Sequence, residues 1–133
     1  MISSLTARSS AGLEPARGVL IVDDQAPFRS VARTVVGRLR GWHVLGEAAT
    51  GEEAVALASA QPPGLVLMDI NLPGINGIEA TRRIVAARPE TVVVLMSTYA
   101  ADDLPPDAQT CGARSYIRKD DLTPRLLRGV IEA

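Results

Sequence analysis

Five side chains able to take part in ionic or nucleophilic chemistry each lie just beyond or at the end of a short apolar run. They are Asp23, Asp24, Asp69, Ser97 and Lys119. If the runs are parallel strands of one sheet, their carboxyl ends bring three carboxylates, a hydroxyl and an ammonium to one edge. Carboxylates held this close repel one another, so a hard divalent cation that prefers oxygen ligands, Mg²⁺, is expected among them.

The order of these residues along the chain suggests how they hold the cation. We expect Asp24 and Asp69 to bind Mg²⁺ directly, with Asp23 acting through water or as a second ligand. The backbone carbonyl of Asn71, which follows Asp69 closely in the sequence, is expected to complete the protein part of the shell. Waters and a phosphate usually occupy the remaining positions around Mg²⁺.

A lysine and a hydroxyl near a metal-bound carboxylate indicate phosphoryl transfer. Such reactions depend on positioning and on neutralising the phosphoryl oxygens, here by the cation, Lys119 and Ser97. One carboxylate then acts as the nucleophile and forms an acyl phosphate. We expect this residue to be Asp69, because its strand should lie between the acidic pair and Ser97.

Each of these residues has an ordinary alternative role when it is taken singly. An aspartate after a strand is often a turn residue or a helix cap. A lone lysine is usually a solvated surface charge. Only the joint pattern across several strand ends favours a shared site.

Apolar runs alternate with helical patterns along most of the chain. The runs cover residues 19–22, 42–48, 65–68, 91–96 and 114–117. Runs without polar alternation are typical of strands buried on both faces, so we expect an α/β fold with an open, doubly wound parallel sheet. The run at 42–48 is weaker and is expected nearer an edge. Pro105 and Pro106 fall where a helix should begin, which leaves residues 99–112 ambiguous.

Composition excludes several other classes of protein. The 133 residues are enough for one ordinary domain, and a net charge of -1 argues against a broadly basic nucleic-acid-binding protein. One cysteine and one histidine exclude a disulfide framework and a zinc cluster within the chain. No apolar run approaches the roughly 18 residues of a membrane span.

The first 18 residues differ in composition from the rest of the chain. They are rich in Ser, Ala, Gly and Arg and lack the apolar segment of a secretory signal. We expect a flexible N-terminal tail over residues 1–18, with a transit peptide as the alternative. A cytoplasmic location is therefore expected.

Three segments resemble the receiver domains of two-component response regulators. They are LIVDD at 20–24, VLMDINLPG at 66–74 and GARSYIRKD at 112–120. The resemblance covers residues 17–133 and implies a receiver domain over residues 19–133. It also implies a flavodoxin-like (CheY-like) fold, in which a five-stranded parallel sheet of order 2-1-3-4-5 carries five helices on its two faces. The two prolines suggest that the fourth helix is short or starts late.

The resemblance also implies roles for individual residues. The matching positions are Asp69 as phosphoacceptor, Asp23 and Asp24 as the acidic Mg²⁺ pair, Asn71 as carbonyl ligand and Lys119 as the partner of the phosphoryl group. Tyr116 matches the switch aromatic of the fifth strand. Ser97 and Thr98 compete for the switch hydroxyl, and the spacing to Asp69 and Lys119 favours Ser97.

Receiver domains act as switches, and the resemblance implies this activity here. A sensor histidine kinase is expected to phosphorylate Asp69, after which Ser97 moves inward and Tyr116 follows. This reshapes the face formed by the fourth helix, the fifth strand and the fifth helix. No enzymatic activity is expected beyond the domain's own Mg²⁺-dependent phosphorylation and dephosphorylation.

Asp120 follows Lys119 where many receivers have proline, which resembles the subgroup fused to LuxR-type helix-turn-helix domains. We therefore expect regulation of transcription through a DNA-binding domain that this chain does not contain. A homodimer is a further expected partner, whereas a membrane is not. The alternatives are a stand-alone receiver and a binding module that no longer relies on phosphorylation. A magnesium-dependent phosphatase is disfavoured, because it needs an acid where Asn71 stands.

Overall fold

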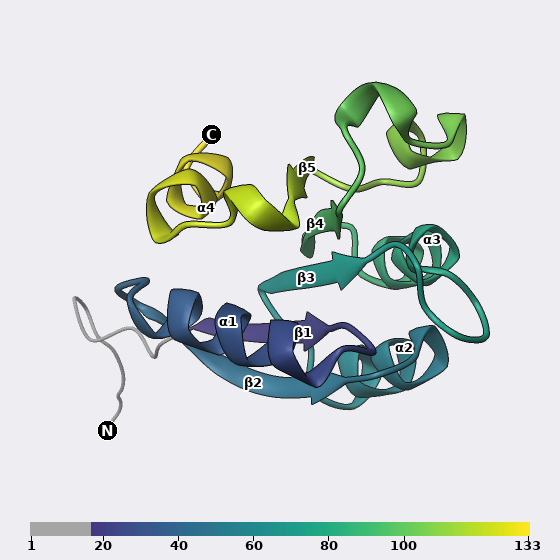
Figure 1. Ribbon diagram of the computed structural model, residues 1–133. Coiled ribbons are helices and arrows are strands. Elements are labelled where there is room, and N and C mark those ends of the chain that lie inside the picture. The colour runs from purple at the N-terminus through teal and green to yellow at the C-terminus, as the bar shows by residue number, and fades with distance from the viewer. Residues whose placement is uncertain (1–16) are drawn as a thin grey trace.

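The computed structural model describes residues 17–133, which form one parallel sheet with helices on both faces (Figure 1). The strands are β1 (Arg17–Val22), β2 (Trp42–Ala48), β3 (Leu65–Asp69), β4 (Val92–Ser97) and β5 (Ser115–Arg118). They lie in the order β2-β1-β3-β4-β5, and every neighbouring pair is parallel. This confirms the expected fold class, including the place of β2 at an edge of the sheet.

The strand β1 begins at Arg17, so the last two residues of the expected tail belong to the sheet. Gly18 pairs with His43 of β2 in the same ladder. The rest of the expected tail, residues 1–16, lies outside the described residues.

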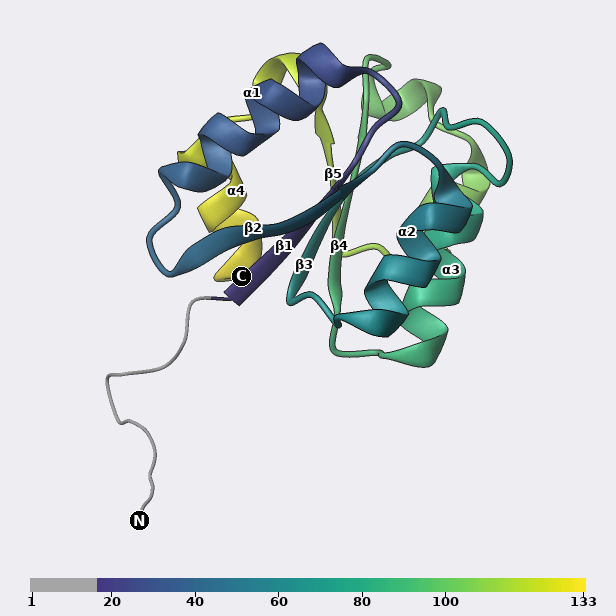
Figure 2. The ribbon, with the colours of Figure 1, turned by 90° about the horizontal axis from the view of Figure 1, so that it is seen from below.

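Four α-helices cover the sheet in the described part of the chain (Figure 2). They are α1 (Ala26–Gly37), α2 (Gly51–Ala60), α3 (Gly77–Ala87) and α4 (Pro124–Ile131). The pair α2 and α3 lies on one face, and the pair α1 and α4 lies on the other. Among residues 17–133, none of the helices is long and apolar enough to span a membrane.

Side-chain caps fix the starts of three of these helices. The Thr50 hydroxyl accepts a hydrogen bond from the Glu53 N–H at 3.0 Å, and the Glu53 carboxylate accepts one from the Ala49 N–H at 2.8 Å, an arrangement close to a capping box. Asn76 caps α3 with its side-chain oxygen, and Thr123 caps α4 with its hydroxyl. These caps set where each strand-to-helix loop ends.

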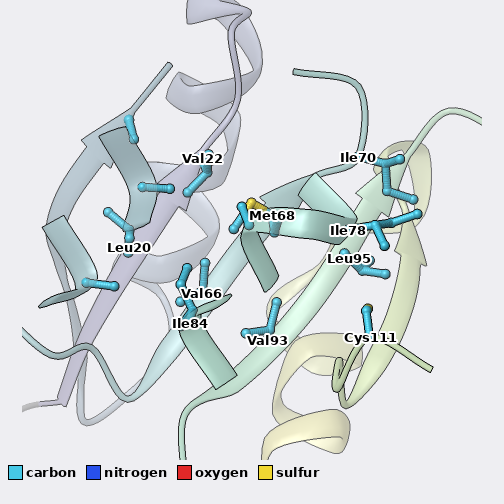
Figure 3. Packing of buried hydrophobic residues seen from close by; sticks show 14 of the residues in the cluster. Leu20, Val22, Val66, Met68, Ile70, Ile78, Ile84, Val93, Leu95 and Cys111 are labelled. Atoms are coloured by element: carbon cyan, nitrogen blue, oxygen red, sulfur yellow. The ribbon is translucent and has the colours of Figure 1, made fainter. Parts of the chain in front are cut away.

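Alternate residues of the central strands pack on opposite faces of the sheet. In β1, Leu20 and Val22 join the cluster under α2 and α3 (Figure 3). Val19 and Ile21 join the cluster under α1 and α4. All four side chains are at most 2% exposed. Burial on both faces is the reason that these strands lack polar alternation.

The fourth of the five helices implied by the family resemblance is absent from the described part of the chain. Two short 3₁₀ helices, η1 (Ala101–Asp103) and η2 (Pro106–Gln109), occupy the connection between β4 and β5. Leu104 and Pro105 each precede a proline and adopt ψ angles of 148° and 147°. The ring of a following proline disfavours helical backbone, so the two prolines divide this segment into separate turns.

A glycine at the start of α3 allows this helix to approach the end of β3. A Cβ atom on Gly77 would lie 2.0 Å from the Asp69 carbonyl oxygen, and that oxygen belongs to the rigid backbone of the sheet. The Gly77 N–H donates to the Ile70 carbonyl at 2.9 Å and fixes the contact. Only glycine fits between the helix and the strand here.

Replacing Gly77 by alanine is therefore expected to destabilise the fold by about 3 kcal/mol, because backbone atoms must move to admit the methyl group. Urea unfolding followed by circular dichroism measures the change. Gly129→Ala in α4 is the matched control, since a Cβ atom there meets nothing within 4 Å. The free energy of unfolding of this control is expected to rise by roughly 0.5–1 kcal/mol, because alanine favours the helix more than glycine does. Equal stability of the two variants would contradict the close approach.

Candidate functional site

The carboxyl edge of the sheet collects the chemically capable side chains. Asp23 and Asp24 follow β1, Asp69 ends β3, Ser97 ends β4, and Lys119 opens the 3₁₀ helix η3 (Lys119–Asp121) directly after β5. Because β1, β3, β4 and β5 are neighbours in one parallel ladder, their ends lie side by side. Chain segments nearly one hundred residues apart therefore meet at one place.

Three carboxylates come together at this edge. Asp23, Asp24 and Asp69 each offer an oxygen atom, and these atoms all lie within 4.8 Å of one another. Asp23 is 1% exposed and Asp69 is 4% exposed, whereas Asp24 is open to solvent. The cluster is therefore buried on one side and accessible from the other.

Lys119 connects the ends of β1 and β3. Its ammonium nitrogen lies 2.6 Å from Asp23 Oδ2 and 3.4 Å from Asp69 Oδ2. It also lies 4.8 Å from the centre of the Phe28 ring, which provides a cation–π contact from α1. Burial alone would lower the pKa of Lys119, but the two carboxylates outweigh this effect and raise the pKa above its usual value. The lysine is therefore firmly charged in its pocket.

The ionised form of Asp69 is disfavoured in this pocket. Loss of hydration is the main cause, and the charge of Asp23 adds to it, so the pKa of Asp69 rises from 3.8 to about 6. Lys119 and the N–H of Asn71, which donates to Asp69 Oδ1 at 3.3 Å, act in the opposite direction. The attraction of one lysine is thus smaller than the combined effect of burial and a second acid.

The donor set fits a magnesium ion. All three side chains offer carboxylate oxygens, which Mg²⁺ prefers, and the exposed side leaves room for waters. Asp23 Oδ2 is buried, and its one charge partner among residues 17–133 is the Lys119 ammonium at 2.6 Å. A buried carboxylate oxygen with unused lone pairs next to two further acids is the arrangement that a divalent cation would complete.

The end of β4 holds the two hydroxyl candidates in different environments. Ser97 is 1% exposed, and its hydroxyl accepts a hydrogen bond from the Tyr99 N–H at 3.2 Å. Thr98 is exposed. The half-buried Tyr116 on β5 donates its hydroxyl to the backbone carbonyls of Ser97 and Tyr99. Tyr116 is therefore linked to the main chain that carries Ser97.

The loop after β3 is anchored by a residue that no sequence pattern singled out. Glu52 of α2 accepts a hydrogen bond from the Ile75 N–H at 3.2 Å. Gly74 has φ +77°, and a Cβ atom there would lie 2.4 Å from the Glu52 carboxylate. The loop that carries Asn71 is thus fixed against α2. Nothing in the local sequence indicated this contact, because 23 positions separate its two partners.

Two residues of α1 near the site were likewise not singled out in the sequence. Phe28 packs against the cluster under α1 and α4 and also contacts Lys119. Arg29 donates to the backbone carbonyl of Asp23 at 2.7 Å. Both residues lie in the first turn of α1, and nothing in the local sequence indicated either contact.

A 2-1-3-4-5 parallel sheet with an acidic cluster and a lysine at its carboxyl edge defines a class of CheY-like phosphoacceptor signalling modules. The family model for the response regulator receiver domain matches residues 19–131, and the chain belongs to this family. The resemblance noted in the sequence is thereby confirmed.

Known relatives agree with this assignment. The response regulator UvrY of Escherichia coli O6:H1 is 36% identical over 101 residues, which cover 76% of this chain and 46% of UvrY. The uncharacterized transcriptional regulatory protein YxjL of Bacillus subtilis is 33% identical over 112 residues, or 84% of this chain and 51% of YxjL. The chain thus spans about half the length of these curated relatives.

A solved structure supports the same assignment. The crystal structure of a two-component response regulator of the LuxR family from Aurantimonas sp. SI85-9A1 matches with a TM-score of 0.78 and 32% sequence identity. The match covers 88% of this chain and 83% of that chain. Both the fold and the sequence therefore place the chain among receivers.

The raised pKa of Asp69 predicts a pH-dependent effect of Asp69→Asn. The folded state binds this proton more tightly than the unfolded state, so ionisation of Asp69 destabilises the wild-type protein as pH rises from about 4 to above 6. In Mg²⁺-free buffer at pH 7.5, we expect Asp69→Asn to raise Tm by roughly 2–4 °C. This increase in Tm should become smaller as the pH is lowered towards 4.5.

Differential scanning fluorimetry at the two pH values measures this change. Asp103→Asn, at an exposed position of η1, is the control and should alter Tm little at either pH. A gain of equal size at both pH values would show that the charge of Asp69 is not its origin.

Proposed function

We propose that this receiver domain accepts a phosphoryl group on Asp69 from a sensor histidine kinase in a Mg²⁺-dependent reaction. One observation carries the proposal, namely the convergence of three carboxylates within 4.8 Å, with Lys119 Nζ 3.4 Å from Asp69. The family of the chain supports it, since receivers are phosphoacceptor modules.

The residues of this site have distinct roles in the proposed reaction. Asp24, Asp69, Asp23 and the Asn71 carbonyl would hold Mg²⁺, which supplies positive charge to the phosphoryl oxygens. A carboxylate oxygen of Asp69 forms a bond to phosphorus while the bond from phosphorus to the kinase histidine breaks. Because Asp69 is almost fully buried, few waters have to leave this oxygen before it approaches phosphorus.

Lys119 and Ser97 would then bind the transferred group. Lys119 already lies beside Asp69, so the ammonium can pair with a phosphoryl oxygen without a large movement. Ser97 is buried at the end of the neighbouring strand, and its hydroxyl can exchange the Tyr99 N–H for a phosphoryl oxygen. Thr98 is a weaker candidate for this role because it is exposed.

The proposed switch passes from Ser97 to Tyr116. The Tyr116 hydroxyl binds the carbonyls of Ser97 and Tyr99, so a shift of the backbone after β4 changes the acceptors available to this ring. A movement of Tyr116 alters the surface formed by β5 and the 3₁₀ turns that precede it. Phosphorylation thus biases two packings of one surface.

The output of the domain is proposed to be transcriptional. The chain spans about half the length of its curated relatives, one of which is named a transcriptional regulatory protein. We propose that a DNA-binding domain outside this chain contacts DNA and that the receiver controls this domain. Homodimerisation of the receiver is one route for this control. A stand-alone receiver acting on other proteins is the alternative role.

A binding module independent of phosphorylation is the second candidate function. The observation in its favour is the replacement of the expected fourth helix by η1 and η2, which changes the usual output surface. Such a module would keep the acidic cluster but would not transmit its occupancy to β5.

Phosphorylation itself is tested with a small donor. Incubation with acetyl phosphate and Mg²⁺ is expected to add one phosphoryl group to the wild-type chain, as measured by intact mass spectrometry. Asp69→Asn removes the nucleophilic oxygen and should abolish the adduct, and EDTA should do the same in the wild type. Asp103→Asn is the control that retains it. An adduct that persists in Asp69→Asn would assign the reaction to another residue.

The switch is tested with beryllofluoride, a stable mimic of the phosphoryl group. With Mg²⁺ present, we expect backbone NMR shifts to extend from the site along residues 97–99 and into β5. Ser97→Ala should confine the shifts to the acidic cluster, whereas Thr98→Ala should leave their extent unchanged. Shifts confined to the cluster in the wild type would favour the phosphorylation-independent module.

A further inference from the structure

The loop between β1 and α1, which carries the acidic pair, is held by an arginine from the helix that follows it. Arg29 Nη1 donates to the Asp23 backbone carbonyl at 2.7 Å. Its side chain is only 22% exposed, so the contact is largely shielded from water. This hydrogen bond closes the loop from the side of α1.

The guanidinium of Arg29 is itself held from β2. Arg29 Nε donates to Glu47 Oε1 at 3.1 Å, and Glu47 pairs with Ile21 in the register of the sheet. Arg33, one turn further along α1, also binds Glu47, at 2.7 and 2.8 Å. Of these two arginines, Arg29 is the one that reaches Asp23. Glu47 therefore anchors Arg29 to the rigid sheet and offsets part of its charge.

The start of α1 lacks the support that the other helices have. Gln25 precedes α1 and makes no side-chain cap, whereas α2, α3 and α4 begin with the capping side chains Thr50, Asn76 and Thr123. Within the loop, Asp23 Oδ1 accepts from the Gln25 N–H at 2.8 Å. The carboxylate of Asp23 is thus used partly to hold its own loop, and the carbonyl is held by Arg29.

We propose that Arg29, clamped by Glu47, is a positioning residue that orients Asp23 and Asp24 for the divalent cation. This inference rests on the proposed function, because it concerns the cation that the phosphorylation site uses. Groups that orient the ligands of a metal commonly change its affinity 10–100-fold when they are removed.

Charge and positioning predict opposite effects for the loss of Arg29. A guanidinium near a cation site repels the cation, so loss of its charge alone should tighten Mg²⁺ binding. Loss of positioning should weaken binding instead. Because Glu47 offsets part of the Arg29 charge and the guanidinium binds the carbonyl of Asp23 directly, we expect positioning to dominate.

The test uses Arg29→Met in the full chain, since methionine keeps an apolar stem in the half-buried position. An NMR titration with MgCl₂, without any phosphoryl donor, should give a Kd about tenfold weaker than in the wild type. Arg33→Met is the matched control, because it removes an arginine bound to the same Glu47 without a contact to Asp23. Its Kd should stay within about twofold of the wild-type value, since only a solvent-exposed charge is lost.

Conservative variants separate positioning from general destabilisation. Arg29→Lys can still donate one bond to the Asp23 carbonyl but cannot hold Glu47 with the same planar group, so an intermediate Kd is expected. Amide exchange in metal-free protein should be faster at residues 23–25 in Arg29→Met than in Arg33→Met. If Arg29→Met does not fold, Glu47→Gln provides the same test, because it removes the charge that clamps Arg29.

Several outcomes would overturn the proposal. These are a wild-type or tighter Kd in folded Arg29→Met, an equal weakening in Arg33→Met, and unchanged exchange at residues 23–25. A wild-type chain that binds no Mg²⁺ would instead reject the proposed function. The exchange measurement would then still decide whether Arg29 holds the loop.

Discussion

The repulsion among carboxylates gathered at one edge of the sheet is the constraint on which the site depends. Asp23 and Asp69 are almost fully buried, and one lysine lies between them. Burial first and the charge of Asp23 second raise the pKa of Asp69, and Lys119 offsets only part of this effect. The fold thus holds a destabilising cluster in place, and the free energy stored there favours a cation or a change in the charge of Asp69.

A rigid scaffold is needed to hold such a cluster together. The central strands are buried on both faces, so their ends cannot move apart without exposing apolar surface. The close contact of Gly77 with the Asp69 carbonyl fixes the end of β3 against α3. Helix side chains hold the loops that carry the remaining groups. Glu52 of α2 binds the β3–α3 loop, and Arg29 of α1 binds the loop of the acidic pair. Residues that take no part in the proposed reaction therefore fix much of the site's geometry.

Most of the fold was predictable because its signals are local. Continuous apolar runs marked the strands, and Thr50 and Thr123 marked helix starts that the structure has. The fourth helix was the error, because Pro105 and Pro106 were expected only to shorten or delay it, whereas the structure has two 3₁₀ helices there instead. The start of β1 at Arg17 was also missed, because Arg17 and Gly18 gain their strand conformation from pairing with β2.

The sequence by itself determined which groups could react, because residue type and position at a strand end are both written in the chain. It did not determine how those groups hold one another. The 2.6 Å contact of Lys119 with Asp23, the Phe28 ring beside the lysine and the Arg29–Glu47 clamp join segments far apart in the chain. Only tertiary structure decides such contacts, since they depend on strand order and on the packing of α1 across the sheet.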